Sequence, residues 1–92
     1  MYYLYVKTHN QTGLKYLGQT SRDPYMYKGS GKRWLNHLRK HGNDITTELI
    51  SAFDTLEDLK AAGQFWSKYW NVVESEEWAN IIPEKGDGGG PE

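Results

Sequence analysis

The sequence predicts a small α+β domain, a three-stranded antiparallel sheet flanked by helices in the order β-β-α-β-α. Two short segments near the start, Tyr3-Leu4-Tyr5 and Tyr16-Leu17-Gly18, are rich in aromatic and branched residues and read as strands. Two later stretches have helical spacing, with a third branched run between them. The 92 residues predict one domain over 1–92. Residues 86–92 are expected to form a flexible, glycine-rich end.

The first two strands are expected to form a hairpin, because the turn formers of residues 9–13 separate them. A turn centred near residues 10 and 11 would place Tyr5 roughly opposite Tyr16. Period-two alternation puts Tyr3 and Tyr5 on one face of the first strand and Leu4 on the other. Two phenols are therefore expected to project side by side from the sheet. A strand tyrosine taken singly is most often a half-buried packing residue.

The first helix is expected to follow the Lys28-Gly-Ser-Gly-Lys32 segment and to end at His41-Gly42. Ser30 is the expected N-cap, and Gly42 suits the left-handed position after the helix. Helical spacing gives a buried stripe and a separate polar stripe. The buried stripe is Trp34, Leu35 and Leu38, with His41 as a further candidate, and the polar stripe is Arg33, His37 and Lys40.

The glycine-rich segment before this helix has the chemistry of a phosphate site. Unpaired N–H groups at a helix N-terminus favour an anion, and Lys28 and Lys32 add two ammonium groups. The spacing does not match the Walker A pattern. Taken alone, the segment is about as well explained as an ordinary capped loop.

Residues 45–53 are branched and loosely alternating, so they predict the third strand. Thr55 and Asp58 have capping-box spacing and open a second helix. Its apolar face is expected to comprise Leu56, Leu59, Ala62, Trp66 and either Tyr69 or Trp70. Gly63 lies inside this helix, which suggests a close approach by another part of the chain.

The net charge of −1 hides a division along the chain. Residues 1–42 hold eight basic residues against Asp23 alone, whereas residues 43–92 hold three basic residues against eleven acids. This asymmetry predicts a surface that faces a polyanion and an acidic surface that could bind a protein partner. The alternative is a solvated surface of balanced charge.

Composition excludes several classes of protein. Without cysteine there is no disulfide scaffold, thiolate zinc site or cysteine nucleophile. No leader opens the chain and no apolar run approaches a membrane span, so we expect a soluble, cytoplasmic protein with no membrane association. His9, His37 and His41 show no metal-ligand spacing with acids, so a histidine-based metal site is not expected.

The ordered motifs resemble those of the GIY-YIG nucleases, especially the small stand-alone phage-type modules. The YLY and YLG segments resemble the two motifs that give the family its name. Residues 32–37 resemble the helix that carries the family's catalytic arginine and a nearby histidine, and residues 40–43 resemble the turn that closes it. Residues 78–81 resemble the segment with the family's structural asparagine. The resemblance covers most of the chain and suggests a phage or mobile-element origin.

The resemblance implies a metal-dependent endonuclease that hydrolyses phosphodiester bonds of DNA with magnesium or manganese. By position, Tyr16 would be the general base, Tyr5 its partner, Arg33 the phosphate clamp and His37 an assisting group. A free phenol has a pKa of about 10, so a base of this kind needs nearby cations or a metal. Two further positions carry over: Gly18 would allow close approach to the phosphate, and Asn80 would hold the backbone around the site.

The chain departs from the family at the metal-binding glutamate, whose expected position falls at Gly63 or Gln64. Neither side chain is an anionic ligand for a hard cation. Another carboxylate, with Glu84 or Glu57 as the first candidates, could supply the ligand. Otherwise Gln64 replaces a native glutamate, or the domain has lost cleavage and binds nucleic acid or a protein without cutting.

Overall fold

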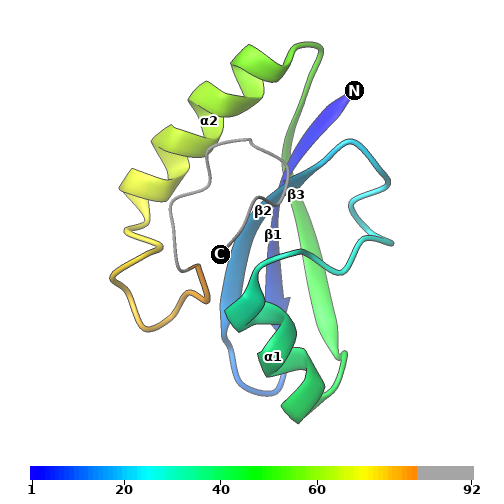
Figure 1. Cartoon of the computed structure of the whole chain (residues 1–92), viewed down its shortest axis with the longest axis vertical. Coiled ribbons are helices and arrows are strands. Elements are labelled where there is room, and N and C mark those ends of the chain that lie inside the picture. The colour runs from blue at the N-terminus through cyan, green and yellow to red at the C-terminus, as the bar shows by residue number, and fades with distance from the viewer. Residues whose placement is uncertain (81–92) are drawn as a thin grey trace.

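The computed structural model describes residues 1–80 and confirms the expected fold class (Figure 1). Its elements follow the order β-β-α-β-α. They are β1 (Tyr2–His9), β2 (Lys15–Thr20), α1 (Lys32–His41), β3 (Ile45–Phe53) and α2 (Leu56–Tyr69). The proposed tail at 86–92 and the candidate ligand Glu84 lie outside the described residues.

The sheet is antiparallel with strand order β2-β1-β3, so the first strand of the chain is central. The expected register of the hairpin was wrong by two residues: Tyr5 lies opposite Gly18, and Tyr16 lies opposite Lys7. The turn closes later than predicted, because the His9 N–H donates to the Leu14 carbonyl over 2.8 Å. A shift of two residues preserves the faces, so Tyr5 and Tyr16 still share one side of the sheet.

The pairing of β1 with β3 shifts between Leu4 and Tyr5, whose partners are Ser51 and Leu49. Ile50 is the extra residue of this bulge. A bulge of this kind changes the alternation along one strand. It explains why Ile45 packs with the Tyr5 side of the sheet while Phe53, an even number of residues later, packs with the Leu4 side.

Helix α1 begins at Lys32, and Gly31 is its N-cap without a side-chain hydrogen bond, so the expected capping by Ser30 was wrong. At the other end Gly42 has a φ of 91° and its N–H donates to the Leu38 carbonyl. Trp34 and Leu38 are buried, whereas His41 is exposed. The helix is thus anchored by two large side chains on one side.

Helix α2 begins as predicted, with the Thr55 side chain accepting a hydrogen bond from the Asp58 N–H. Most of its expected apolar face is confirmed, because Leu59, Ala62 and Trp66 pack in the core, whereas Leu56 is exposed. Leu59, Gly63 and Ser67 are its buried residues, and Trp70 packs against the core while Tyr69 is exposed. Gly63 and Ser67, which lie beside these positions on the helix, widen the predicted face.

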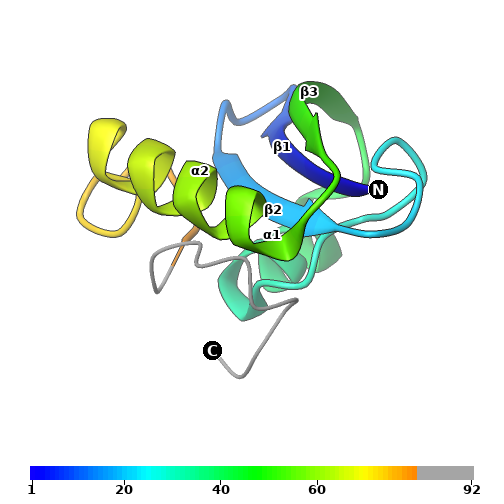
Figure 2. The ribbon, with the colours of Figure 1, turned by 90° about the horizontal axis from the view of Figure 1, so that it is seen from above.

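Alternate side chains of the sheet enter two separate cores. Leu4, Val6 and Leu17 pack with Leu59 of α2, whereas Tyr5 and Tyr16 pack with Trp34 and Leu38 of α1. The two helices therefore lie on opposite faces of the sheet, as Figures 1 and 2 show. Neither helix of the described chain is long and apolar enough to cross a membrane.

Candidate functional site

The two phenols of the YLY and YLG motifs lie beneath α1 and the chain that leads into it. Tyr5 is 0% exposed and Tyr16 is 1% exposed. Tyr16 stacks on Trp34 with ring centroids 5.7 Å apart, and its hydroxyl lies 3.5 Å from the Ser30 hydroxyl. The structure thus brings together Tyr5, Tyr16 and Ser30, three residues singled out in the sequence.

Gly18 is needed because of the side chain that crosses it. A Cβ atom at this position would overlap the phenol oxygen and ring of Tyr5. Gly29 is similarly restricted: its φ is +104°, and a Cβ there would lie 2.8 Å from the Trp34 ring. In the described residues, the close approach at Gly18 is therefore made by Tyr5.

Basic side chains of α1 form a shallow pocket whose lining includes neither phenol. Leu14 contributes to its lining, and the pocket has a volume of about 360 Å³. Most of its lining is polar or basic and comes from one helix: Arg33, Asn36, His37, Lys40 and His41. A pocket of this composition suits an anion such as a phosphate group. We call this pocket, together with Tyr5 and Tyr16, the α1 site.

His37 is held in the α1 site by a relay of hydrogen bonds. The Thr12 hydroxyl lies 2.7 Å from His37 Nε2 and 3.0 Å from His9 Nδ1. His9 Nδ1 also accepts from the Thr12 N–H, and His9 Nε2 lies 3.1 Å from the Gly42 carbonyl oxygen. A carbonyl only accepts, so His9 carries its proton on Nε2, the Thr12 hydroxyl donates to His9, and His37 Nε2–H donates to Thr12.

Charge and burial make His37 less basic than an ordinary histidine. Burial is the largest cause that lowers its pKa, followed by repulsion from His41, His9, Arg33 and Lys40 when these groups are protonated. The His37 and His41 rings are only 4.5 Å apart between centroids. An anion bound in the pocket would offset this repulsion between cations.

Lys7 is a buried charged residue that sequence reasoning did not identify. It is 2% exposed, and its ammonium group donates to the Pro24 carbonyl over 2.8 Å and to the Thr47 hydroxyl over 2.7 Å. Burial lowers its pKa, against an opposing effect of Asp23. The same ammonium group lies 5.1 Å from the centroid of the Tyr5 ring. In the sequence, the only indication that Lys7 is buried was its alternation in β1, which places it on the same face as Tyr3 and Tyr5.

The segment before α1 places its two lysines at the surface. Lys28 and Lys32 are exposed, and the Lys28 carbonyl accepts a 2.8 Å hydrogen bond from Trp34 Nε1. This bond fixes the segment against the helix that follows. The lysines are consequently held near the N-terminus of α1, the end that favours an anion.

Asn80 joins the end of the described chain to the hairpin. Its side-chain amide donates to the Leu17 carbonyl over 2.9 Å, and its carbonyl oxygen accepts from the Leu17 N–H over 3.0 Å. Lys15 forms a parallel bridge with Trp78 beside it. Asn80 therefore holds the backbone of β2 next to Tyr16 and Gly18.

The candidate metal positions do not join the α1 site in the described chain. Gly63 is buried on α2, while Gln64 and Glu57 are exposed on the same helix, which packs on the other face of the sheet. Within residues 1–80, no group of three or more histidine or acidic side chains could hold a metal ion. His9, His37 and His41 lie close together, but their neighbours are cations and hydrogen-bond partners.

Comparison with known proteins adds no family to these observations. No protein-family model matches the sequence, and neither a curated protein nor a solved structure matches the chain. The geometry of the α1 site is thus the basis on which a function can be proposed.

Proposed function

We propose that this protein is an endonuclease that hydrolyses phosphodiester bonds of DNA at the α1 site. One observation carries the proposal: Tyr5 and Tyr16 pack in the same core as Trp34 of α1, and the same helix presents Arg33 and His37 to a pocket. These residue types match the needs of phosphodiester hydrolysis, which requires cations for the phosphate and a group that accepts a proton.

In this proposal the basic side chains bind the phosphate and the phenols act on water. Arg33 and Lys40 would neutralise the charge that develops on the phosphate oxygens, and an interaction of this kind is often worth about 3–4 kcal/mol. Tyr16, as phenolate, would take the proton of the attacking water. Because Tyr16 is 1% exposed, its covering chain must move before water or substrate reaches the hydroxyl.

Magnesium or manganese is part of the expectation, yet the described residues do not fit such an ion at the α1 site. The pocket lining is cationic, amide or apolar, without a carboxylate, and hard cations prefer carboxylate oxygens. We therefore assign no step to a metal. Glu84 is the remaining candidate ligand from the sequence, and its contribution is left to mutagenesis.

Nicking of supercoiled plasmid, with magnesium, with manganese and with EDTA, tests the proposal. We expect the protein to nick, and Tyr16→Phe and Arg33→Ala each to reduce the rate by at least 100-fold, as for the loss of one electrostatic catalytic group. Arg39→Ala is the matched control, because Arg39 is exposed on α1 and lies outside the pocket. Robust cutting by both the Tyr16 and the Arg33 variants would refute the assignment.

A DNA-binding module that does not cut is the second candidate. It is favoured by the burial of both phenols and by the lack of a carboxylate among the described residues that line the pocket. If the protein binds DNA without nicking under any of these conditions, this second function replaces the first. Gln64→Glu should then not restore cutting, because position 64 lies on α2, which packs on the opposite face of the sheet from the α1 site.

A further inference from the structure

A second concave surface lies on the face of the sheet opposite α1. It is an open groove of about 410 Å³ at the C-terminal end of α2. Val6 and Ile50 of the sheet contribute to it, together with Tyr69 and Trp70 from the end of α2 and Trp78 from the chain that follows. We call it the α2 groove.

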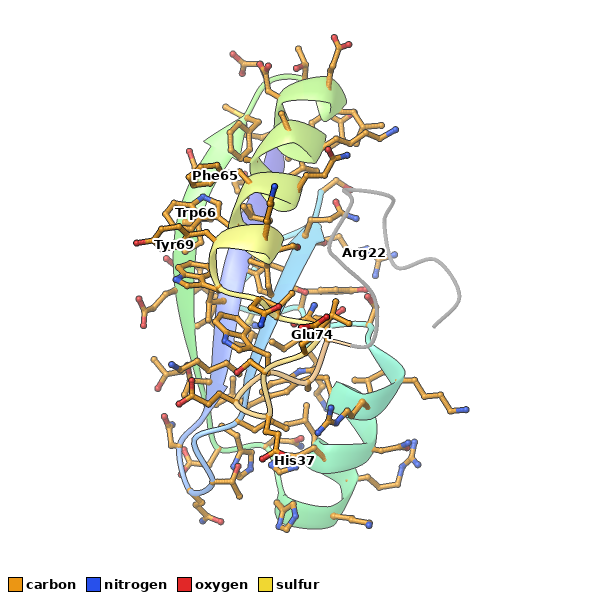
Figure 3. All side chains as sticks on the ribbon, turned by 90° about the vertical axis from the view of Figure 1, so that its left-hand side faces the viewer. Arg22, His37, Phe65, Trp66, Tyr69 and Glu74 are labelled. Atoms are coloured by element: carbon orange, nitrogen blue, oxygen red, sulfur yellow. The ribbon has the colours of Figure 1, made fainter. Side chains whose placement is uncertain are left out.

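The α2 groove continues into a row of aromatic rings along α2. Trp70 stacks on Trp66 at 4.5 Å and on Trp78 at 5.2 Å between ring centroids, and Tyr69 stacks on Phe65 at 6.0 Å. Tyr69 is 69% exposed and Phe65 is 58% exposed. Figure 3 shows Phe65, Trp66 and Tyr69 together along one side of the helix. Clustered exposed aromatic rings of this kind mark an interaction surface.

Charge decides what such a surface can bind. Two carboxylates, Glu48 of β3 and Glu77, line the groove with a single ammonium group, that of Lys15. Lys15 is itself placed over the Trp78 ring, 5.7 Å from the centroid. The aromatic wall thus already accepts one cation, and the two carboxylates favour another.

We propose that the α2 groove binds an arginine or lysine side chain of a partner protein. The exposed aromatic ring of Tyr69 would receive the cation, and Glu48 and Glu77 would pair with its charge. Residues 43–80 hold eight acidic residues against Lys60 and Lys68, so this half of the chain repels the phosphates of a nucleic acid. The proposal does not depend on DNA cleavage, because the α1 site lies on the other face.

Titration with a synthetic peptide of alternating arginine and threonine, followed by tryptophan fluorescence and calorimetry, tests this inference. We expect the arginine peptide to bind at least tenfold more tightly than the same peptide with glutamine in place of arginine. Tyr69→Ala should weaken binding about two- to fivefold, in line with one cation–π contact. The double variant Glu48→Gln with Glu77→Gln should weaken it about tenfold.

Two exposed residues outside the groove provide matched controls. Tyr25→Ala removes another exposed tyrosine, and Glu76→Gln neutralises a carboxylate next to Glu77, so both should bind the arginine peptide unchanged. Equal affinity for the two peptides, or equal losses in the groove and control variants, would overturn the proposal. Binding of a dT12 oligonucleotide that is lost in Tyr69→Ala would instead identify the groove as a nucleic-acid surface.

Discussion

Gly18 has no side chain beyond a hydrogen atom, and the Tyr5 ring of the paired strand occupies the space that this leaves. The packing of the two residues is therefore coupled. The coupling gives the glycine of the YLG motif a packing role that is independent of any ligand. It also fixes the position of the Tyr5 phenol, because the ring lies directly against the backbone of β2. The packing of Tyr5 alone can therefore account for the glycine of the YLG motif.

We predict that Gly18→Ala destabilises the protein by about 1–3 kcal/mol, the usual cost of excess volume in a packed core. In a Tyr5→Leu background the same change should cost less than about 1 kcal/mol, since the overlapping ring atoms are gone. Urea unfolding followed by tryptophan fluorescence measures all four proteins. Equal costs in the two backgrounds would show that Tyr5 is not the source of the strain.

The lowered pKa of His37 predicts a dependence of stability on pH. The unfolded side chain titrates near 6.5, so above that pH the folded and unfolded states bind the same number of protons at this site. As the pH falls below about 6.5, the unfolded state takes up a proton first, and the free energy of unfolding decreases. The loss ends once the pH is below the pKa of the folded state.

Urea unfolding of the wild type and of His37→Gln between pH 5 and 8 measures this effect. The wild type should lose stability more steeply on acidification than His37→Gln. His9 and His41 remain in both proteins, so the difference in slope reports His37 together with its coupling to these two rings. Parallel profiles would mean that the repulsion within the α1 site does not affect its protonation.

Among the elements, strand β2 depends on a residue far along the chain. The two hydrogen bonds from Asn80 to Leu17 satisfy a buried backbone N–H and a buried carbonyl beside the Tyr16 position. Asn80 is 3% exposed, so water has little access to replace these bonds. A buried polar group left without its partner costs about 1–3 kcal/mol.

We expect Asn80→Ala to destabilise the protein by about 2–4 kcal/mol and to increase hydrogen exchange of the Leu17 amide selectively. The exposed Asn43 provides the control, since Asn43→Ala removes the same side chain from a loop. Hydrogen exchange measured by NMR separates this local effect from general unfolding. Unchanged protection of Leu17 would contradict the role assigned to Asn80.

For the whole molecule, the separation of charge predicts how DNA binding responds to salt. The exposed cations at the α1 site and its preceding segment suggest three or four phosphate contacts: Lys28, Lys32, Arg33 and Lys40. Each contact contributes about −0.9 to the slope of log affinity against log salt. The slope for duplex DNA should accordingly lie at about −3 to −4.

Fluorescence anisotropy with a labelled duplex between 50 and 200 mM salt, roughly the range in which counterion release is large, measures this slope. Lys40→Ala should reduce its magnitude by about one, whereas Lys68→Ala on α2 should leave it unchanged. An affinity that does not change with salt would argue against phosphate contacts. If Lys40→Ala and Lys68→Ala changed the slope equally, the result would argue against DNA binding at α1.

Local patterns in the sequence were sufficient for the elements and their faces. The branched run over 45–53 gave the bounds of β3, and the Thr55–Asp58 spacing gave the start of α2, because both depend on neighbouring residues. Alternation also placed Tyr5 and Tyr16 on one side of the sheet. Each of these features follows from the repeat of a strand or helix, which the order of residues already contains.

The tertiary structure decided the contacts between distant parts of the chain. The hairpin register followed from how the turn closed, and the burial of Lys7 depended on Pro24 and Thr47, which lie 17 and 40 residues away. The same applies to the relay from Thr12 to His37, 25 residues apart. Sequence periodicity specifies which face a residue takes, but only the packing of the elements determines what it meets there.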